Sequence, residues 1–313
     1  MKYLFFDIEC SNCFNGVGKM CEFGYVLCDE NLNVMKKGDI PMSPGKGEGN
    51  RFHLRGRKNE KDLELAYEYD YYFNQPEFPS FYNQIKRLME EPDTICFAFS
   101  MDNDIPHLYH ACTRYKLAPM NYICYDVQKL AGRYLEKKGQ MSLKNACLEI
   151  VGPHSLVTLQ EHLSRDDAMM EKMIFDAICL LQQTKPAELL EQSNFAKTNS
   201  LDYMKCIKEH AKRKKEKTAG HDLYRKYIID DDELDKAEYA GKRYNVSAAV
   251  KSHLDDLKRA IDVIKSKDGI FSNRLDKTDY FVVLDEKNKE EIIKATNGRF
   301  SGEYVMLEEL LSK

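Results

Sequence analysis

Two acidic residues close the first apolar segment of the chain, MKYLFFDIEC. The aromatic and branched residues from Tyr3 to Phe6 predict a buried β-strand, and Asp7 and Glu9 stand at its end. Residues i and i+2 of a strand point to the same face, so both carboxylates should project together. Neighbouring carboxylates repel each other, and burial strengthens the repulsion. A divalent cation would remove this cost, because hard cations prefer carboxylate oxygens, whereas a solvated strand end would tolerate the pair.

A second acidic group follows another apolar segment. Residues 94–100, TICFAFS, are typical of a strand covered on both faces, and the next residues, MDND, include Asp102 and Asp104. A helix is expected to follow from Ile105 to Lys116. These acids therefore also stand where a strand passes into a helix.

A third group lies in HLSRDDAMM. Apolar residues recur with helical spacing over 170–181, which places Asp167 in the first helical turn and His162 just before the helix. Ser164 is expected as the N-cap, with Asp167 at the N3 position of a capping box. This structural role is compatible with a catalytic one.

The elements around these groups predict an α/β domain, because strands alternate with helices. Further strands are expected over residues 21–28, 33–36 and 122–125, the first two forming an antiparallel meander with the opening strand. Helices are expected over residues 81–89 and from 126 to 150. Residues 38–60 are rich in Gly, Pro and basic side chains and predict a long functional loop, and the tyrosine-rich AYEYDYYF after it is expected mainly to pack.

In order and spacing, the three groups resemble the DnaQ-like, DEDDh family of 3′-to-5′ exonucleases, which includes proofreading subunits and RNA-trimming enzymes. The family's first motif, Asp-x-Glu after an apolar strand, matches Asp7 and Glu9, and its Glu-x-Gly in the next strand matches CEFGYVL. Its second motif matches FAFSMDNDIPHL at Asp104. Its third, His-x(4)-Asp-Ala, matches HLSRDDA at His162 and Asp167. The resemblance covers residues 1–185 and implies an RNase H-like mixed sheet with flanking helices.

The chain departs from the family pattern before the second-motif aspartate. Many members have a His-Asn pair there, whereas this chain has Phe99-Ser100. Asp102 therefore competes with Asp104 for that role. Asp166 likewise competes with Asp167, although the five-residue step from the histidine and the alanine that follows favour Asp167.

The resemblance implies an active site with two Mg²⁺ or Mn²⁺ ions, which can activate water and stabilise the leaving oxygen in phosphodiester hydrolysis. Asp7 would bridge both ions. Glu9 and Asp167 would complete the site of the ion that activates water, and Asp104 would hold the second ion through water. His162 would act as the general base, because the pKa of an imidazole lies near the working pH.

The composition indicates a soluble globular protein with room for two domains. The 313 residues carry a net charge of -4, so no global basic signature for nucleic acid is present. No secretory leader and no transmembrane span is expected, which predicts a cytoplasmic protein with reduced cysteines. Cys10 and Cys13 form a CxxC, but no second ligand pair follows at zinc-site spacing, so ordinary cysteines are expected instead of structural zinc.

Two charge blocks follow the exonuclease-like region. Residues 205–217, KCIKEHAKRKKEK, contain seven Lys or Arg and two Glu, a local net charge of +5, and IIDDDELDKAEY after them is acidic. The simpler interpretation is a charged helical linker over residues 186–237. The alternative is a basic grip on the phosphates of a nucleic acid.

Residues 238–313 resemble a BRCT domain, a small α/β domain that binds phosphopeptides or DNA ends. The resemblance rests on GKRYNVS as the first strand, SKDGIFSNRLDKTDYFVV as a glycine turn and hydrophobic strand, and KNKEEIIKA as the second helix. The family's double glycine is Asp268-Gly269 here, and its late tryptophan is absent. By resemblance, Ser247 and either Lys289 or Lys287 would bind phosphate, although a turn serine and exposed helix lysines explain them equally well. Helices are expected over residues 254–264, 287–296 and 307–311.

Together these features predict a metal-dependent 3′-to-5′ exonuclease of single-stranded or frayed DNA 3′ ends, acting in replication or repair. The C-terminal domain would bind a protein or a DNA end, and no membrane contact is expected. An exoribonuclease is the nearest alternative, because the motifs alone do not separate DNA from RNA. Alternatives from other classes are a non-catalytic module that binds nucleic acid or phosphopeptides, and a structural zinc protein.

Overall fold

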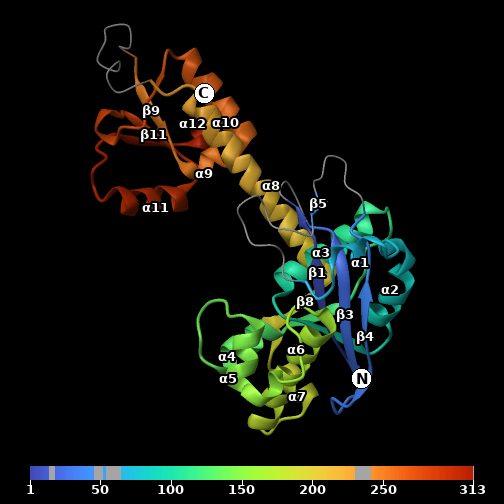
Figure 1. The fold of residues 1–313 in the computed structure, drawn as a ribbon. Helices are drawn as coiled ribbons and strands as arrows, with labels where there is room; N and C mark the ends of the chain where they lie inside the picture. Colours follow the sequence, from blue (N-terminus) through green and yellow to red (C-terminus); the bar gives the residue numbers. More distant parts are fainter. Residues whose placement is uncertain (14–17, 46–51, 54–64, 230–240, 313) are drawn as a thin grey trace. The chain divides into compact units, whose positions relative to one another are not determined.

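The computed structural model describes residues 1–313 except 14–17, 46–51, 54–64, 230–240 and 313 (Figure 1). The chain separates into two compact units, Met1–Lys205 and Cys206–Lys313. Much of the expected loop over residues 38–60 and most of the acidic block over 228–239 therefore lie outside the described residues. Among the described residues, no helix is long and apolar enough to cross a membrane.

The first unit is built on a six-stranded sheet with the strand order β4-β3-β1-β6-β7-β8. Strands β4, β3 and β1 are antiparallel, β1, β6 and β7 are parallel, and β8 is antiparallel to β7. The strands are β1 Lys2–Cys10, β3 Met20–Cys28, β4 Val34–Pro41, β6 Thr94–Ala98, β7 Ile123–Asp126 and β8 Lys197–Asn199. Two short strands, β2 Asn12–Cys13 and β5 Phe52–His53, form a separate pair. The predicted mixed α/β architecture and the antiparallel meander are confirmed.

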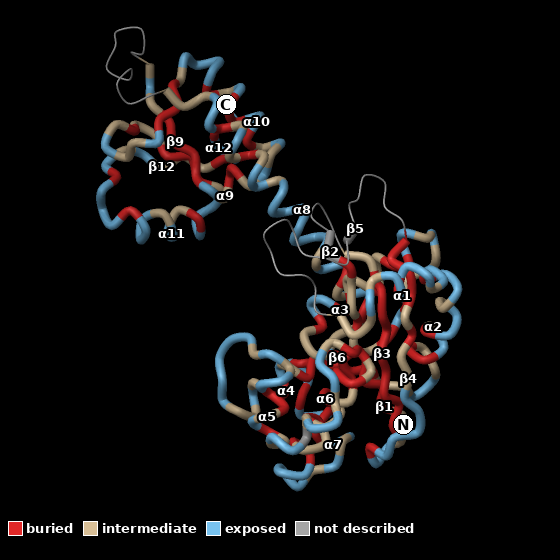
Figure 2. The backbone as a smooth tube through the Cα atoms, in the orientation of Figure 1, coloured by how far each residue is buried: buried red, intermediate tan, exposed pale blue. Residues whose placement is uncertain are grey.

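Helices flank this sheet, as predicted. They are α1 Tyr69–Phe73, α2 Tyr82–Glu90, α3 Met101–Arg114, α4 Val127–Tyr134, α5 Leu143–Ile150, α6 Ser164–Leu181 and α7 Pro186–Glu191. Helix α6 packs on β1 and β3, and Figure 2 shows both strands buried along most of their length. Helix α3 begins at Met101 instead of Ile105, so Asp104 falls inside its first turns.

An aromatic cluster forms the centre of the core between α6 and the sheet. The ring of Phe97 on β6 stacks on Phe5 of β1 at a centroid distance of 4.6 Å and meets Phe175 of α6 at 4.7 Å. Tyr3 and Tyr125 extend the cluster along β1 and β7. Each ring removes a large apolar area from water, so this cluster fixes α6 against the parallel strands.

The first sheet runs further along the chain than the sequence indicated. Residues 186–199, expected within a helical linker, instead form α7 and the edge strand β8. Buried Leu189 and Leu190 place α7 in the same core. The long helix α8 follows from Ser200 to Arg225 and carries the predicted basic block.

The second unit contains a four-stranded parallel sheet in the order β10-β9-β11-β12. Its strands are β9 Arg243–Val246, β10 Ile270–Phe271, β11 Tyr280–Val283 and β12 Glu303–Met306, and its helices are α9 Ala248–Lys251, α10 Leu254–Ser266, α11 Glu286–Thr296 and α12 Leu307–Leu311. The three predicted helices are confirmed, whereas α9 and β12 were not predicted. Strand β12 buries no residue completely, so EYVM lacks the apolar signature of a strand.

We expect Phe97→Ala to lower the free energy of unfolding of the first unit by about 3–5 kcal/mol, because it removes a fully buried ring from the aromatic cluster. Urea denaturation followed by circular dichroism of the full chain measures the change. The matched control is Phe195→Ala, because the Phe195 side chain is 47% exposed. Equal stability losses for the two variants would contradict the central role of this cluster.

Candidate active site

The first two acidic groups meet at one edge of the large sheet. Asp7 and Glu9 lie toward the carboxyl end of strand β1. Asp104 lies near the start of α3, which directly follows β6. Because β1 and β6 are parallel neighbours, their carboxyl ends reach the same edge. Asp104 is 4% exposed, and its carboxylate accepts a hydrogen bond from the backbone N–H of Ile8.

The start of α6 brings the third group to the same place. Ligand atoms of Glu9, His162 and Asp167 all lie within 4.8 Å of one another. The Nδ1 atom of His162 is 3.5 Å from Oε1 of Glu9, and the His162 side chain is 43% exposed. His162 has a φ of 61°, in the left-handed region, and its N–H donates to Oδ2 of Asp167 at 3.2 Å. The left-handed conformation and this hydrogen bond therefore fix the turn before α6, with the side chains of His162 and Asp167 near Glu9.

The carboxylates strongly perturb one another. Burial and then the charge of Asp104 raise the pKa of Asp7 well above its ordinary value, with further contributions from Glu9 and Asp167. Burial and then the charge of Glu9 raise the pKa of Asp104 in the same direction. The same two causes raise the pKa of Asp167 to about 7. Four acids from three elements therefore share one electrostatic environment.

This donor set fits divalent cations. The Oδ2 atom of Asp7 is buried and has no hydrogen-bond partner among the described residues. A buried carboxylate oxygen without a donor is costly, and so are like charges in close proximity. Carboxylate oxygens with one imidazole nearby form a ligand set for a hard cation such as Mg²⁺ or Mn²⁺. Among the residues the structure describes, the geometric metal cluster contains no cysteine, and the side chain of Cys13 lies outside that part of the chain.

The two competing aspartates point elsewhere. Asp102 is exposed and accepts a hydrogen bond from the hydroxyl of Tyr203. Asp166 accepts from the backbone N–H of Gln160 at 3.0 Å and pairs with Arg165. Asp104 and Asp167 therefore occupy the positions that face the other acids.

The predicted capping box at α6 is wrong. Helix α6 begins at Ser164, its N-cap residue is Leu163, and no side chain caps it there. The backbone N–H and the hydroxyl of Ser164 instead both donate to Oε1 of Glu22, each at 2.7 Å. A charge-assisted bond to a buried carboxylate has displaced the local cap.

Glu22 anchors the start of α6 from strand β3. Its second oxygen accepts from the hydroxyl of Tyr72 at 2.5 Å, and neighbouring Asp39 accepts from Tyr67 at 2.7 Å. Burial, followed by the charge of Asp39, raises the pKa of Glu22 to about 7. Packing was the expected role of the tyrosine-rich stretch, and Tyr72 is fully buried, but its hydroxyl also completes this network.

Gly24 allows α6 to approach the sheet. It lies opposite Asp7 of β1 and Asp39 of β4. A Cβ added at Gly24 would lie 1.9 Å from the carbonyl carbon of Ser164. Backbone contact at this point places the first turn of α6 directly over the carboxylates of β1.

The site contains a further buried acid that the sequence analysis missed. Glu171 of α6 is completely buried, and its Oε1 accepts from the backbone N–H of Phe99 at 3.0 Å. Burial and then the charge of Asp7 raise its pKa. This bond holds the turn into α3, where Ser100 has a φ of 72°. The available signal was the position of Glu171, four residues after Asp167 and therefore on the same helical face.

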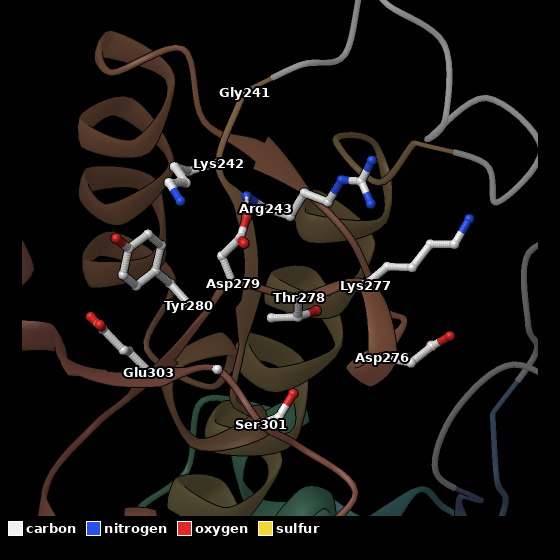
Figure 3. Close-up of a pocket in the computed structure, with 11 residues that line it drawn as sticks. Gly241, Lys242, Arg243, Asp276, Lys277, Thr278, Asp279, Tyr280, Ser301 and Glu303 are labelled. Atoms are coloured by element: carbon white, nitrogen blue, oxygen red, sulfur yellow. Dashed lines mark hydrogen bonds between the residues drawn. The ribbon is translucent and has the colours of Figure 1, made fainter.

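In the second unit, the two residues predicted to bind phosphate, Ser247 and Lys289, both interact with neighbouring residues of the chain. Ser247 is buried and accepts from the N–H of Val250 as the N-cap of α9, while Lys289 pairs with Glu286 at 3.3 Å. Neither residue lines the cavity of about 870 Å³ shown in Figure 3. That cavity lies at the amino ends of β9, β11 and β12, and three cationic and three acidic side chains line it: Lys242, Arg243, Lys277, Asp276, Asp279 and Glu303.

No protein-family model matches the sequence, and no curated protein matches it. Among solved structures, the chain is similar to a 3′-exonuclease that recognises the 3′ end of a histone mRNA stem-loop, with 16% identity, 59% of this chain and 83% of that chain covered, and a TM-score of 0.44. The nuclease domain of 3′hExo, a DEDDh family member bound to rAMP, is 16% identical, with 58% of this chain and 92% of that chain covered and a TM-score of 0.44. E. coli Exonuclease I in complex with a dA16 oligonucleotide is 10% identical, with 57% of this chain and 41% of that chain covered and a TM-score of 0.42.

We expect Gly24→Ala to lower the free energy of unfolding by about 1–3 kcal/mol, because the new methyl group would force the first turn of α6 away from β3. Gly132→Ala is the matched control. Its Cβ would meet nothing closer than 3.6 Å within helix α4, so alanine there should stabilise the protein by about 0.5–1 kcal/mol. Thermal or urea unfolding of both variants measures the two changes in the free energy of unfolding, which should have opposite signs. A Gly24→Ala variant as stable as the parent protein would contradict the close backbone contact between Gly24 and Ser164.

Proposed function

We propose that the chain is a metal-dependent 3′-to-5′ exonuclease of the DnaQ-like, DEDDh type. One observation carries the proposal: acids from β1, α3 and α6 meet at a single sheet edge, beside His162 and around a buried carboxylate oxygen that has no described donor. The order of the three motifs along the sequence supports the same assignment. A non-catalytic module would not require the mutual repulsion of these carboxylates.

The proposed site would hold two Mg²⁺ or Mn²⁺ ions, which supply an activated water and stabilise the charge on the leaving oxygen. Asp7 offers Oδ2, which has no described hydrogen-bond partner, and the charges of Asp104, Glu9 and Asp167 all raise its pKa. Glu9 and Asp167 lie together and would bind one ion. Asp104 lies outside that cluster and would serve the second.

His162 is the proposed general base. Its ring lies beside Glu9 and is partly exposed, so a solvent molecule has access to it. In this role the ring would accept a proton from the attacking water. The left-handed backbone of His162 and its N–H bond to Asp167 orient the ring toward the acids.

The proposed substrate is a single-stranded or frayed DNA 3′ end, and an RNA 3′ end is the alternative. Matched 5′-labelled DNA and RNA strands, incubated with Mn²⁺ or Mg²⁺, test both. A ladder that shortens from the 3′ end and disappears with chelator supports the exonuclease, and the faster substrate identifies the sugar preference. Binding of both strands without cleavage would instead support the non-catalytic module.

We further propose that the second unit is a BRCT-like domain that binds a protein or a DNA end and acts with the nuclease in replication or repair. Its four parallel strands, with β9 between β10 and β11, support this proposal. A phosphate-binding role for Ser247 and Lys289 requires Lys289 to leave Glu286. That exposed pair is weak, so a phosphate could displace it at little cost.

We expect Asp104→Asn to reduce cleavage about 10³-fold or more, because losing a metal-binding charge removes several kcal/mol of transition-state stabilisation. Folding stability should be unchanged or higher, since the substitution removes one of several mutually repelling acids. Asp102→Asn, two residues away and exposed, is the matched control and should retain activity. Equal activity of the two variants would reject Asp104 as a metal ligand.

We expect His162→Ala to slow cleavage about 10²- to 10⁴-fold, the usual contribution of a general base. Its effect should fall on kcat, because the ring is proposed to accept a proton and not to bind the strand. His154→Ala is the control, since His154 is exposed in a neighbouring turn. A change confined to KM would show that His162 binds substrate and that the base lies elsewhere.

A further inference from the structure

The middle of helix α8 is largely exposed. None of residues 205–219 is buried in the described structure, and Figure 2 shows this part of α8 as solvent-exposed. Buried residues of the helix, such as Met204 and Tyr224, occur only toward its ends. A helix segment without buried residues has few core contacts to determine its side chains, so solvent and binding partners are the main constraints on its composition.

Four lysines form one stripe along this segment. Lys205, Lys208, Lys212 and Lys215 follow the i, i+3, i+7, i+10 spacing that places residues on one face of an α-helix, and all four are exposed. At 1.5 Å per residue, the stripe extends over about 15 Å. On this stripe Lys212 pairs with Glu216 at 3.9 Å, with the Lys212 side chain 77% exposed. Such an exposed pair neutralises little charge.

This arrangement is unfavourable for an isolated helix. Like charges three or four residues apart repel each other and destabilise the helix. A polyanion lying along the stripe would reverse that effect and release its own counterions. Lysines spaced about 5 Å apart along a helix axis can reach successive phosphates of a nucleic-acid strand.

We propose that the lysine stripe of α8 binds the phosphate backbone of nucleic acid, independently of base sequence. The proposal rests on the proposed function only for the choice of nucleic acid as the polyanion. A membrane surface is a poorer partner, because the segment lacks the apolar face with which an amphipathic helix enters the headgroup region. The contacts would add affinity for the strand without touching the reacting bond.

The test compares two double variants in the same helix. Lys212→Gln with Lys215→Gln removes two charges from the stripe, whereas Lys214→Gln with Lys217→Gln removes two charges at the same spacing from another face. Glutamine has a helix propensity similar to that of lysine, so the helix is preserved in both. Binding of a fluorescent single-stranded DNA 20-mer to the full chain is measured with chelator present, across a range of salt concentrations.

For the stripe variant we expect binding about tenfold weaker or more at low salt, and a log–log salt slope smaller by about 1.4, which is about 0.7 for each lost phosphate contact. The off-stripe variant should keep a slope close to that of the parent protein. Equal losses of DNA affinity in both variants, or no loss in either, would contradict the proposal that the stripe binds the phosphate backbone.

Because chelator prevents metal-dependent cleavage, this result is independent of the nuclease assignment. A chain that cleaves neither DNA nor RNA with metal present, yet shows the stripe-specific loss, would reject the proposed exonuclease and support the stripe. Cleavage of a dinucleotide should be the same in both double variants, since a single phosphate cannot span the stripe. Slower cleavage of the dinucleotide by the stripe variant alone would contradict the proposal that the stripe adds affinity without acting at the reacting bond.

Discussion

The mutual repulsion of Asp7, Glu9, Asp104 and Asp167 is the constraint on which the first unit depends. Burial and these like charges raise the pKa of three of the four carboxyl groups. Such a cluster persists only if the surrounding structure holds it in place, because separation of the acids would relieve the repulsion. The parallel pairing of β1 with β6 and the aromatic cluster beneath it provide that restraint.

Helix α6 is the second restraint, and its position is determined by contacts remote in sequence. Ser164 and Glu22 are 142 residues apart, yet two hydrogen bonds join them. Gly24 admits the helix backbone, and Tyr72 saturates the remaining oxygen of Glu22. The same helix also carries Glu171, which holds the turn ahead of Asp104. One helix therefore positions acids that belong to two different motifs.

These contacts explain which parts of the site were predictable. Asp7, Glu9, Asp104, His162 and Asp167 lie in short motifs whose spacing and flanking strands are visible locally, so the sequence indicated them and the structure brings them to one edge. The roles of Ser164 and Glu171 depend on partners 142 and 72 residues away, and no local pattern encodes such a partner. The capping box failed for that reason, because a local cap competed with a buried carboxylate. Strand β8 was missed because its one exposed and two partly buried residues, at a sheet edge, carry no periodic signal.

The net charge of -4 conceals two opposed local fields. One is the cluster of acids at the sheet edge, and the other is the block of +5 over residues 205–217. Fields in physiological salt decay over about 8 Å, so a nucleic-acid strand responds to the side chains near it and not to the sum over the chain. Two divalent cations would also offset the four negative charges of the acidic cluster. A weakly acidic composition is therefore compatible with a chain that binds polyanions at both places, and only the distribution of charge along the structure distinguishes this case from a protein that repels them.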